Sequence, residues 1–426
     1  MTVSLKFYKV FTTALTRFLP LYLRRRVSAG KEDPARLPER FGTASISRPS
    51  GPLVWMHAAS VGESTMLLPL ISHMRERRPD VTILITTGTM TSANLMAKRL
   101  PSGAIHQYAP ADIPAAVAKF LNHWKPSLAI WAESELWPNM ILQTRNLGIA
   151  TALINGRMSE KSLAGWGRRK KAAQNLIGGF DLIQAADQDT ANGLSSILER
   201  DIDVTGNLKY AGPALPVDGT ALAVLKTATK GRPIWAAAST HHGEEGLVAL
   251  AHKAVLKTLP SALLILAPRH PRRGDLVERI LTDSGLTIAR RSRGETPSAG
   301  HQVYLFDSLG EMGLLYALAP ASCIAGSLAP GLSGHNPLEP ARMGSAILSG
   351  ANIDSFKDIY APLIEAGGAQ IIRDTVAFPA AIIELLTNDT ARTAQIDAAR
   401  TLASSQDAIL DAVWTGLLPF MPERKG

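Results

Sequence analysis

From about residue 52 onward, short apolar runs alternate with longer amphipathic stretches of helical periodicity. In the first half of the chain the strand candidates are "PLVWMHAA", "VTILITTGT", "AIHQYA", "LAIWAES", "IATALING", "LIQAAD" and "IDVTGN". Apolar strands separated by helices are typical of βαβ units, in which helices cover both faces of a parallel sheet. The alternation therefore predicts an α/β fold built on Rossmann-like parallel sheets.

The alternation is interrupted once, at residues 211–231, where prolines and glycines indicate a linker. It restarts with the candidates "PIWAAAST", "ALLILAP", "LTIARR", "HQVYLF", "ASCIAGS", "SAILSG" and "AQIIRD". We therefore expect two Rossmann-like lobes, residues 31–210 and 232–375, that face a central cleft at the carboxyl ends of their strands. Residues 376–426 are expected to be helical and to pack back on the first lobe.

Residues 1–30 are apolar but lack the uninterrupted run of about 20 apolar residues that a membrane span needs. In a helix, one face would carry Leu5, Phe7, Phe11, Leu15 and Phe18, and three arginines follow. This pattern favours an amphipathic segment that lies on the inner, anionic face of a membrane. A helix docked on the protein's own surface is the alternative, and a cleaved signal peptide is disfavoured because no compact apolar core precedes a small-residue cleavage site.

Charge and cysteine content restrict the classes of partner. The formal net charge of +9 favours phosphorylated small molecules or anionic lipid. Nucleic acid is not expected, because aromatic residues make up only 6% of the chain and no nucleic-acid motif occurs. The one cysteine, Cys323, excludes a disulfide framework and a cysteine metal cluster, and it suits a reducing compartment.

The stretch "LVWMHAASVGES" predicts a buried strand, a turn through Ser60 and a helix that begins near Glu63. A serine hydrolase elbow is one reading of such a turn, but "AASVG" departs from G-x-S-x-G and only one strand precedes it. Ser60 is better explained as a helix cap. Glu63 is then either a first-turn carboxylate that the helix dipole favours, or a general base at a strand end.

"LAIWAESELWPN" repeats the arrangement with Glu133 and Glu135 at a strand end. Two residues apart in extended chain, both carboxylates point to the same side. Their like charges should perturb each other's pKa, which makes at least one of them a site candidate, with helix capping as the alternative.

In the second lobe, "LLILAPRHPRRGD" ends a strand with Arg269 and His270 and opens a helix at Pro271. Helix-start amides beside a guanidinium suit a phosphate, although a solvated basic turn has the same pattern. "DSLGEMGLLYA" places Gly310 where the backbone can approach a ligand before a helix.

Two further stretches bear on the choice between a metal and a nucleotide. "GHNPLEPARMG" offers His335, Asn336 and Glu339 around a helix start, and the carboxylate of Glu339 suits ribose hydroxyls. "STHHGEEG" suggests a metal, but adjacent His241 and His242 do not share a face, and a capped helix start explains them better. Walker A and G-x-G-x-x-G sequences do not occur, so an NTPase or a standard dinucleotide enzyme is not supported.

Eight short stretches occur in a recognisable order between about residue 35 and beyond residue 360: "HAASVGE", "AESELWPN", "NGRMS", "GNLKY", "ASTHHGEE", "PRHPRR", "GEMGLLYA" and "GHNPLEPA". In this order they strongly resemble the 3-deoxy-D-manno-octulosonic acid (Kdo) transferases of Gram-negative lipopolysaccharide synthesis. The resemblance implies a GT-B glycosyltransferase that moves Kdo from CMP-Kdo to a lipid A precursor at the cytoplasmic face of the inner membrane. It also implies inversion at the anomeric carbon, no catalytic metal and no cofactor.

The resemblance further implies residue roles, carried over motif by motif. Glu63 would be the catalytic base, and Glu133 and Lys209 would stabilise the transition state. The first lobe would bind the acceptor. The second would bind CMP through Arg269, His270, Gly310, Glu311, Met312, Asn336, Pro337, Leu338 and Glu339. The N-terminal segment is less uniformly apolar than a typical family anchor, which leaves its mode of membrane attachment open.

Three other functions remain as alternatives. They are a GT-B transferase that uses a UDP-sugar, a membrane-surface protein that binds nucleotide sugar or phospholipid without turnover, and an esterase with Ser60 as nucleophile.

Overall fold

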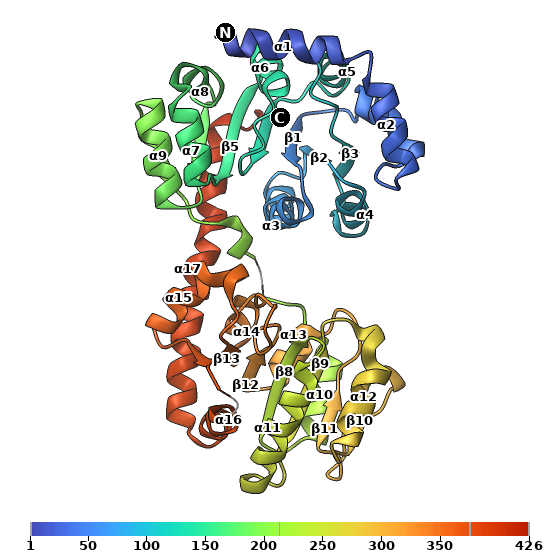
Figure 1. The fold of residues 1–426 in the computed structure, drawn as a ribbon, viewed down its shortest axis with the longest axis vertical. Coiled ribbons are helices and arrows are strands. Elements are labelled where there is room, and N and C mark those ends of the chain that lie inside the picture. The colour runs from blue at the N-terminus through green and yellow to red at the C-terminus, as the bar shows by residue number, and fades with distance from the viewer. Residues whose placement is uncertain (1, 213, 375, 425–426) are drawn as a thin grey trace. The chain divides into compact units, whose positions relative to one another are not determined.

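The computed structural model describes residues 2–212, 214–374 and 376–424. The chain forms two compact units, one made of Met1–Gly212 with Gln406–Gly426 and the other of Pro213–Ser405. We call them the first and the second unit. Each unit contains one seven-stranded sheet whose paired strands are all parallel (Figure 1).

The sheet of the first unit has the strand order β3-β2-β1-β4-β5-β6-β7. Its strands are β1 Leu53–Ala58, β2 Thr82–Thr87, β3 Ala104–Tyr108, β4 Leu128–Ala132, β5 Ala150–Gly156, β6 Leu182–Ala185 and β7 Asp203–Val204. Strand β1 pairs with β2 on one side and with β4 on the other, so the chain reverses its direction of travel across the sheet between β1 and β4. In open α/β sheets the crevice at such a reversal, outside the carboxyl ends of the strands, is the usual ligand site.

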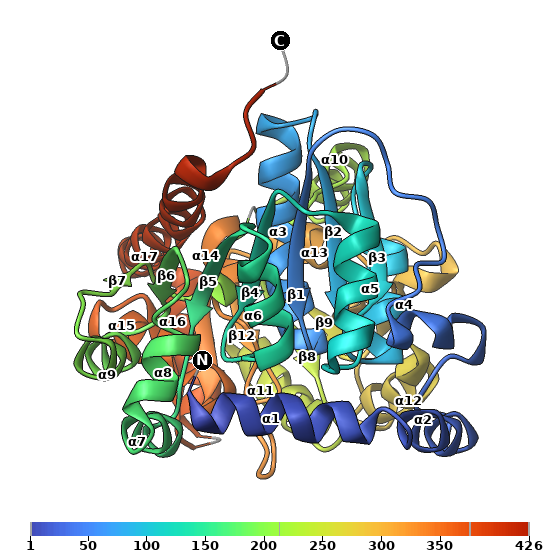
Figure 2. The same ribbon diagram turned by 90° about the horizontal axis from the view of Figure 1, so that it is seen from above.

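Helices cover both faces of this sheet, as Figure 2 shows for α5 and α6 on one face and α3 on the other. The helices of the first unit are α1 Val3–Leu15, α2 Leu19–Ser28, α3 Val61–Arg77, α4 Met90–Arg99, α5 Pro114–Trp124, α6 Pro138–Asn146, α7 Glu160–Gly167, α8 Lys170–Leu176 and α9 Gln188–Leu198, with short 3-10 turns η1 Pro34–Phe41 and η2 Leu208–Tyr210. Because both faces of the central strands are buried, these strands are mainly apolar, and β1 is buried along its whole length.

The second unit repeats this plan with the order β10-β11-β9-β8-β12-β13-β14. Its strands are β8 Ile234–Thr240, β9 Leu263–Pro268, β10 Ile288–Arg290, β11 Val303–Leu305, β12 Ala321–Ile324, β13 Ala346–Gly350 and β14 Ala369–Ile372. Its helices and 3-10 turns are α10 Gly219–Ala228, α11 Glu244–Thr258, η3 Pro271–Arg273, α12 Gly274–Asp283, η4 Arg291–Arg293, α13 Met312–Leu318, α14 Leu338–Met343, η5 Asp354–Phe356, α15 Lys357–Glu365 and α16 Ala377–Thr387. Strands β8 and β12 pair with each other in parallel, and the chain reverses its direction of travel across the sheet between them.

Every strand predicted from the apolar runs is present, within a few residues of the expected bounds. The segment 211–231 differs from the expected linker, because it contains α10, which buries Leu225 and packs against α13. The prolines and glycines lie mainly at its ends, and "ALAVLKTA" between them has good helix formers.

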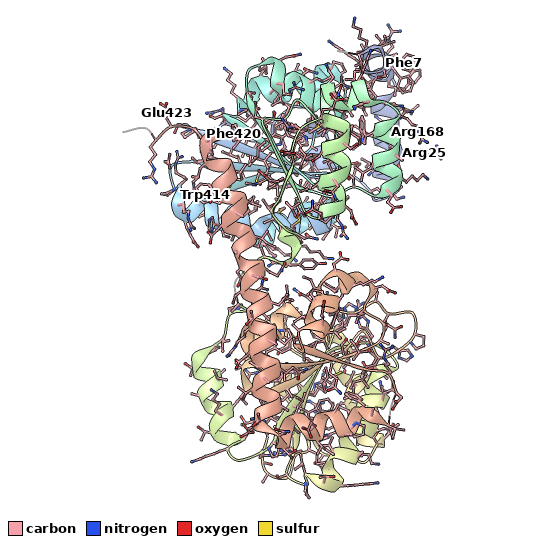
Figure 3. All side chains as sticks on the ribbon, turned by 90° about the vertical axis from the view of Figure 1, so that its left-hand side faces the viewer. Phe7, Arg25, Arg168, Trp414, Phe420 and Glu423 are labelled. Atoms are coloured by element: carbon pink, nitrogen blue, oxygen red, sulfur yellow. The ribbon has the colours of Figure 1, made fainter. Side chains whose placement is uncertain are left out.

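The tail beyond residue 376 is helical. Helix α16 packs on α11 of the second unit. Helix α17 Asp389–Leu417 is followed by η6 Leu418–Phe420, and from Gln406 onward the chain belongs to the first unit. There Trp414, labelled in Figure 3, is buried in the same core as Leu67 of α3.

The N-terminal helix α1 packs against α5 and α6 through one face only. Leu5 and Thr12 are buried there, and the Tyr8 hydroxyl donates a 3.0 Å hydrogen bond to Asp112. Leu5 therefore does not share the face of Phe7 and Phe11, as the sequence pattern suggested; those two rings are exposed and stack at 6.3 Å. No described helix is long and apolar enough to cross a membrane.

Candidate active site

Glu63 lies in the first turn of α3, directly after the turn that follows β1. The Ser60 hydroxyl accepts the Glu63 backbone N–H at 3.2 Å and donates to the Glu63 carboxylate at 2.6 Å. The other carboxylate oxygen accepts the Ala59 N–H at 2.8 Å. These three hydrogen bonds hold the carboxylate at the carboxyl end of β1, and the bond from the Glu63 N–H to the Ser60 hydroxyl confirms that Ser60 is a helix cap.

Glu133 follows β4, the neighbour of β1, and its backbone is left-handed with φ 56°. A left-handed non-glycine residue costs roughly 1–2 kcal/mol. Its N–H still donates to the Ile154 carbonyl at 3.1 Å, so the sheet hydrogen bonding continues past the strand end. The left-handed turn thus ends β4 and sets the direction of the following chain.

The acidic and basic groups around Glu133 interact electrostatically. Burial raises the pKa of Glu133, the charge of Glu63 raises it further, and Arg157 and Lys209 oppose the shift. Burial also raises the pKa of Glu135, which accepts a 2.8 Å hydrogen bond from the Trp137 indole. The charges of Glu63 and Lys209 therefore both act on Glu133. The charge of Glu135 also raises the pKa of Glu133, but less than that of Glu63, and the charge that raises the pKa of Glu135 is that of Glu63 and not of Glu133.

Lys209 is positioned by two asparagines that the sequence analysis did not single out. Asn155, buried at the end of β5, accepts the Leu208 N–H at 2.8 Å, and Asn207 accepts the Lys209 N–H at 3.0 Å. Asn155 also has a left-handed backbone, with φ 51°. The sequence signal for this role was an asparagine at the end of a predicted strand, in "NGRMS" two residues before Arg157. Apart from glycine, asparagine is among the residues that adopt the left-handed conformation most readily.

In the second unit, Arg269 and His270 follow β9 and are exposed, and the Arg269 N–H donates to the Thr240 carbonyl at 2.9 Å. The His270 ring lies 6.2 Å from the ring of His241, which follows β8. His241 in turn stacks on His335, with 3.0 Å between their Nε2 atoms. Burial, His241 and Arg269 lower the pKa of His335 to about 4. The histidines of "STHHGEEG" and "GHNPLEPA" therefore meet beside Arg269.

Glu244 fixes the loops that carry these groups. Its fully buried carboxylate accepts four backbone N–H groups, from His241 and Gly326 at 2.8 Å, from Ser327 at 3.0 Å and from Leu328 at 2.8 Å. "STHHGEEG" is a helix start, as expected, with Glu244 as the first residue of α11. Among the described residues, no group of three or more His, Cys, Asp or Glu could hold a metal ion.

The start of α14 carries Asn336, Pro337, Leu338 and Glu339, and Asn336 accepts the Leu338 N–H at 3.0 Å. Burial raises the pKa of Glu339, whereas Arg269 and Arg342 lower it. Arg269 therefore acts on both His335 and Glu339, so groups following β9 and β12 converge electrostatically.

The segment Gly310, Glu311 and Met312 follows β11, the neighbour of β9. Gly310 has φ +82°, and Met312 begins α13. The Glu311 carboxylate forms an ion pair with Arg291 at 2.5 Å, which lowers its pKa. A contribution of this segment to a ligand would therefore come from its backbone.

Comparisons with known proteins agree on one family. The model of the 3-deoxy-D-manno-octulosonic-acid transferase (kdotransferase) family matches residues 35–212. A probable mitochondrial 3-deoxy-D-manno-octulosonic acid transferase of Arabidopsis thaliana is 34% identical over 96% of this chain and 94% of its own. The 3-deoxy-D-manno-octulosonic acid transferase of Haemophilus influenzae is 34% identical over 83% of both chains.

A solved glycosyltransferase structure from Rickettsia africae matches 87% of this chain and 99% of its own with a TM-score of 0.55 at 12% identity, which supports the fold alone. The two parallel sheets are those of the GT-B fold, as expected. With 34% identity over nearly the whole length of both chains, this protein belongs to the Kdo transferase family of glycosyltransferases.

Proposed function

We propose that this protein transfers Kdo from CMP-Kdo to a lipid A precursor, with inversion at the anomeric carbon and with Glu63 as the general base. The observation that carries the proposal is the placement of Glu63 and Glu133 at the ends of the neighbouring strands β1 and β4, in a member of the Kdo transferase family. This is the edge of an α/β sheet where substrates usually bind.

In the proposed reaction, Glu63 takes the proton of the acceptor hydroxyl while the hydroxyl oxygen attacks the anomeric carbon and CMP leaves from the opposite face. One displacement gives inversion. Ala59 and Ser60 each use one acceptor position of the carboxylate. A carboxylate has about four such positions, so others stay open to the acceptor hydroxyl.

Glu133 and Lys209 would act on the charges that develop in the transition state. The carboxylate of Glu133 would stabilise positive charge at the anomeric carbon as its bond to CMP breaks. Lys209, whose charge already acts on Glu133, would offset the donor's carboxylate or the leaving phosphate. Preorganised charges of this kind assist departure of a leaving group without a metal.

The second unit would bind CMP. Arg269 and His270 would hold the phosphate, the backbone of Gly310, Glu311 and Met312 would approach the nucleotide, and the segment 336–339 would hold the ribose through Glu339. What supports this assignment is that Arg269 acts electrostatically on Glu339.

The surface of α1 and α2 supports a peripheral position on the cytoplasmic face of the inner membrane, where a lipid acceptor would be met. Val3, Phe7 and Val10 are each more than two-thirds exposed. Arg25 and Arg168 lie on the same side of the first unit as Phe7 (Figure 3). Exposed apolar residues beside arginines match the pattern of interfacial helices.

The decisive experiment incubates the full chain with CMP-Kdo and a lipid A precursor and detects the product by mass spectrometry. We expect the precursor mass to increase by whole Kdo units, with competition by CMP but not by UDP, and with activity that persists in EDTA. Competition by UDP alone would indicate a different donor, and binding of CMP-Kdo without product would indicate a binding protein.

A further inference from the structure

A cavity of about 300 Å³ lies within the first unit, beside the turn that carries Glu63. Helix α2 forms one wall, and Ala59, Gly88 and Ala109, which follow β1, β2 and β3, form another. The volume is at the lower end of the range for ligand pockets. Ala59 connects the cavity to the candidate active site, because its N–H binds the Glu63 carboxylate.

The cavity wall is mainly apolar. Its larger apolar side chains are Leu19, Tyr22, Leu23, Trp137 and Met140. The same helix α2 exposes Leu21 and Tyr22 to solvent, and Phe18 just before it is exposed as well. The apolar exterior described above therefore continues along α2 to the cavity.

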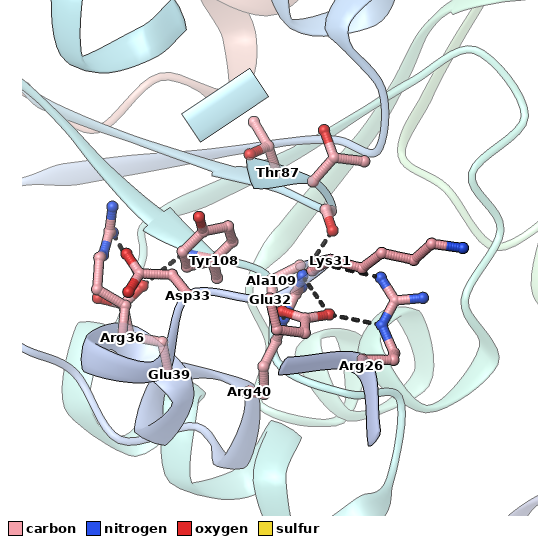
Figure 4. Close-up of polar contacts among 12 residues, drawn as sticks. Arg26, Lys31, Glu32, Asp33, Arg36, Glu39, Arg40, Thr87, Tyr108 and Ala109 are labelled. Atoms are coloured by element: carbon pink, nitrogen blue, oxygen red, sulfur yellow. Dashed lines mark hydrogen bonds and ion pairs between the residues drawn. The ribbon is translucent and has the colours of Figure 1, made fainter. Parts of the chain in front are cut away.

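Three charged residues of the wall, Arg26, Glu32 and Arg40, are already paired with one another. Glu32 binds Arg40 at 3.0 Å and Arg26 at 2.9 Å, and Arg40 also donates to the carbonyl oxygens of Gly88 and Ala109 (Figure 4). These contacts join the end of α2 to the ends of β2 and β3. Because Arg40 is committed to these contacts and Arg26 is paired with Glu32, the cavity offers a phosphate or carboxylate little uncompensated positive charge.

Asp112, the remaining charged residue of the wall, is held by hydrogen bonds from uncharged groups. Its carboxylate accepts the backbone N–H groups of Asn139 at 3.1 Å and Met140 at 2.7 Å, and the Tyr8 hydroxyl at 3.0 Å.

His57 supplies a different kind of group. Its ring is 2% exposed, Nδ1 lies 3.0 Å from the Thr86 hydroxyl, and Nε2 has no hydrogen-bond partner among the described residues. Burial, followed by the charge of Arg40, lowers the pKa of His57 to about 3, so the ring is neutral at physiological pH. A buried polar atom without a partner costs free energy, and a ligand that supplies a partner removes that cost.

We infer that this cavity binds an alkyl segment of the acceptor, with one uncharged polar group of that segment hydrogen-bonded to Nε2 of His57. The apolar wall, the paired charges and the single neutral unpartnered nitrogen all select an uncharged chain over an ionic group. The inference rests on the proposed function, because it takes the acceptor to be a lipid. Bound in this way, the chain holds the acceptor's polar head beside the turn of Glu63.

A binding experiment tests the cavity without turnover. The probe is an alkyl glycoside brominated near the end of its chain and used below its micelle concentration, because bromine quenches a nearby indole. Trp137 lines the cavity. Its fluorescence is obtained by subtracting the tryptophan fluorescence of the Trp137→Phe protein from that of the wild type. We expect this difference signal to be quenched, and Ala111→Phe, which fills the cavity from another wall, to weaken the quenching at least tenfold.

Absence of quenching in the wild-type difference signal overturns the inference, and so does equal quenching in Ala111→Phe. The wild-type measurement is decisive by itself if Ala111→Phe does not fold. Surface binding to α1 and α2 would survive the Ala111→Phe change and is thereby distinguished from binding in the cavity.

A kinetic experiment links the cavity to the acceptor. It compares KM for an acylated and a fully deacylated acceptor that share one head group. We expect Ala111→Phe to raise the KM for the acylated acceptor, relative to the KM for the deacylated one, at least tenfold. Val224→Phe, at an exposed position on α10, should leave this ratio unchanged. Transfer with an unchanged ratio in Ala111→Phe overturns the inference and leaves the proposed function intact. If the probe quenches the Trp137 signal but the wild-type protein transfers no Kdo, the cavity binds an alkyl chain and the proposed function is wrong.

Discussion

Glu63 and Glu133 stand at the carboxyl ends of adjacent parallel strands, and after burial the charge of Glu63 is the largest influence that raises the pKa of Glu133. The pKa of Glu133 is thus higher in the folded chain than in the unfolded one. Its contribution to stability is therefore present below about pH 4, the unfolded pKa, and is lost as the pH rises through the folded pKa.

We expect Glu133→Gln to increase the melting temperature more at pH 7 than at pH 4, because the variant removes a group whose ionisation opposes folding. The same change should lower kcat, since it removes a charge from the proposed transition-state site. Thermal unfolding at both pH values measures the first effect. An equal shift at the two pH values would show that Glu133 has an ordinary pKa.

Glu63→Gln should reduce kcat by at least about 100-fold, the usual contribution of a general base. Glutamine keeps the side-chain oxygen that accepts the Ala59 N–H, so the start of α3 and the binding of CMP should be retained. Turnover and CMP titration measure the two effects. Glu76→Gln, exposed on the same helix, is the matched control and should stay fully active. Undiminished turnover in Glu63→Gln would exclude Glu63 as the base.

Asn155 is expected to matter for Lys209 although it touches no substrate. Asn155→Ala and Asn155→Gly both leave the buried Leu208 N–H without its partner, which costs about 1–3 kcal/mol. Alanine should be the less stable of the two by about 1 kcal/mol, because the position is left-handed. Chemical denaturation gives both numbers.

Both Asn155 variants should also lose kcat while they keep the KM for CMP-Kdo, because Asn155 and Lys209 lie in the first unit. A purely structural role would lower the stability of the variants and leave kcat of the folded enzyme unchanged.

Glu244→Ala should lower the free energy of unfolding by more than about 4 kcal/mol. Four backbone N–H groups would lose a buried anionic acceptor, and each unpaired group costs about 1–3 kcal/mol. Glu365→Ala, exposed on α15, provides the control for loss of a glutamate from the second unit. Similar melting temperatures for the two variants would show that water replaces the carboxylate.

The strands of both units could be predicted from the sequence because they are buried on two faces. A strand such as "LVWMHA", which is buried at every position, is apolar except for His57, and this pattern is local. The helix start at Ser60 and Glu63 was equally local, since the capping hydrogen bond joins residues three apart in the sequence. Helix α10 was mistaken for a linker because prolines and glycines stand at its ends, while the helix itself is held by distant packing on α13.

The sequence by itself thus determined the strands, the helix starts and, through its motifs, the family. Only the tertiary structure decided which strand ends lie next to one another. Strand order follows from how the crossover helices pack, and it places β4 beside β1, so that Glu133 comes under the influence of Glu63, which is far away in the chain. The same long-range packing sets Asn155 against Leu208, His241 on His335, and Leu5 on the buried side of α1. Contacts between residues so distant leave no periodic pattern in the sequence.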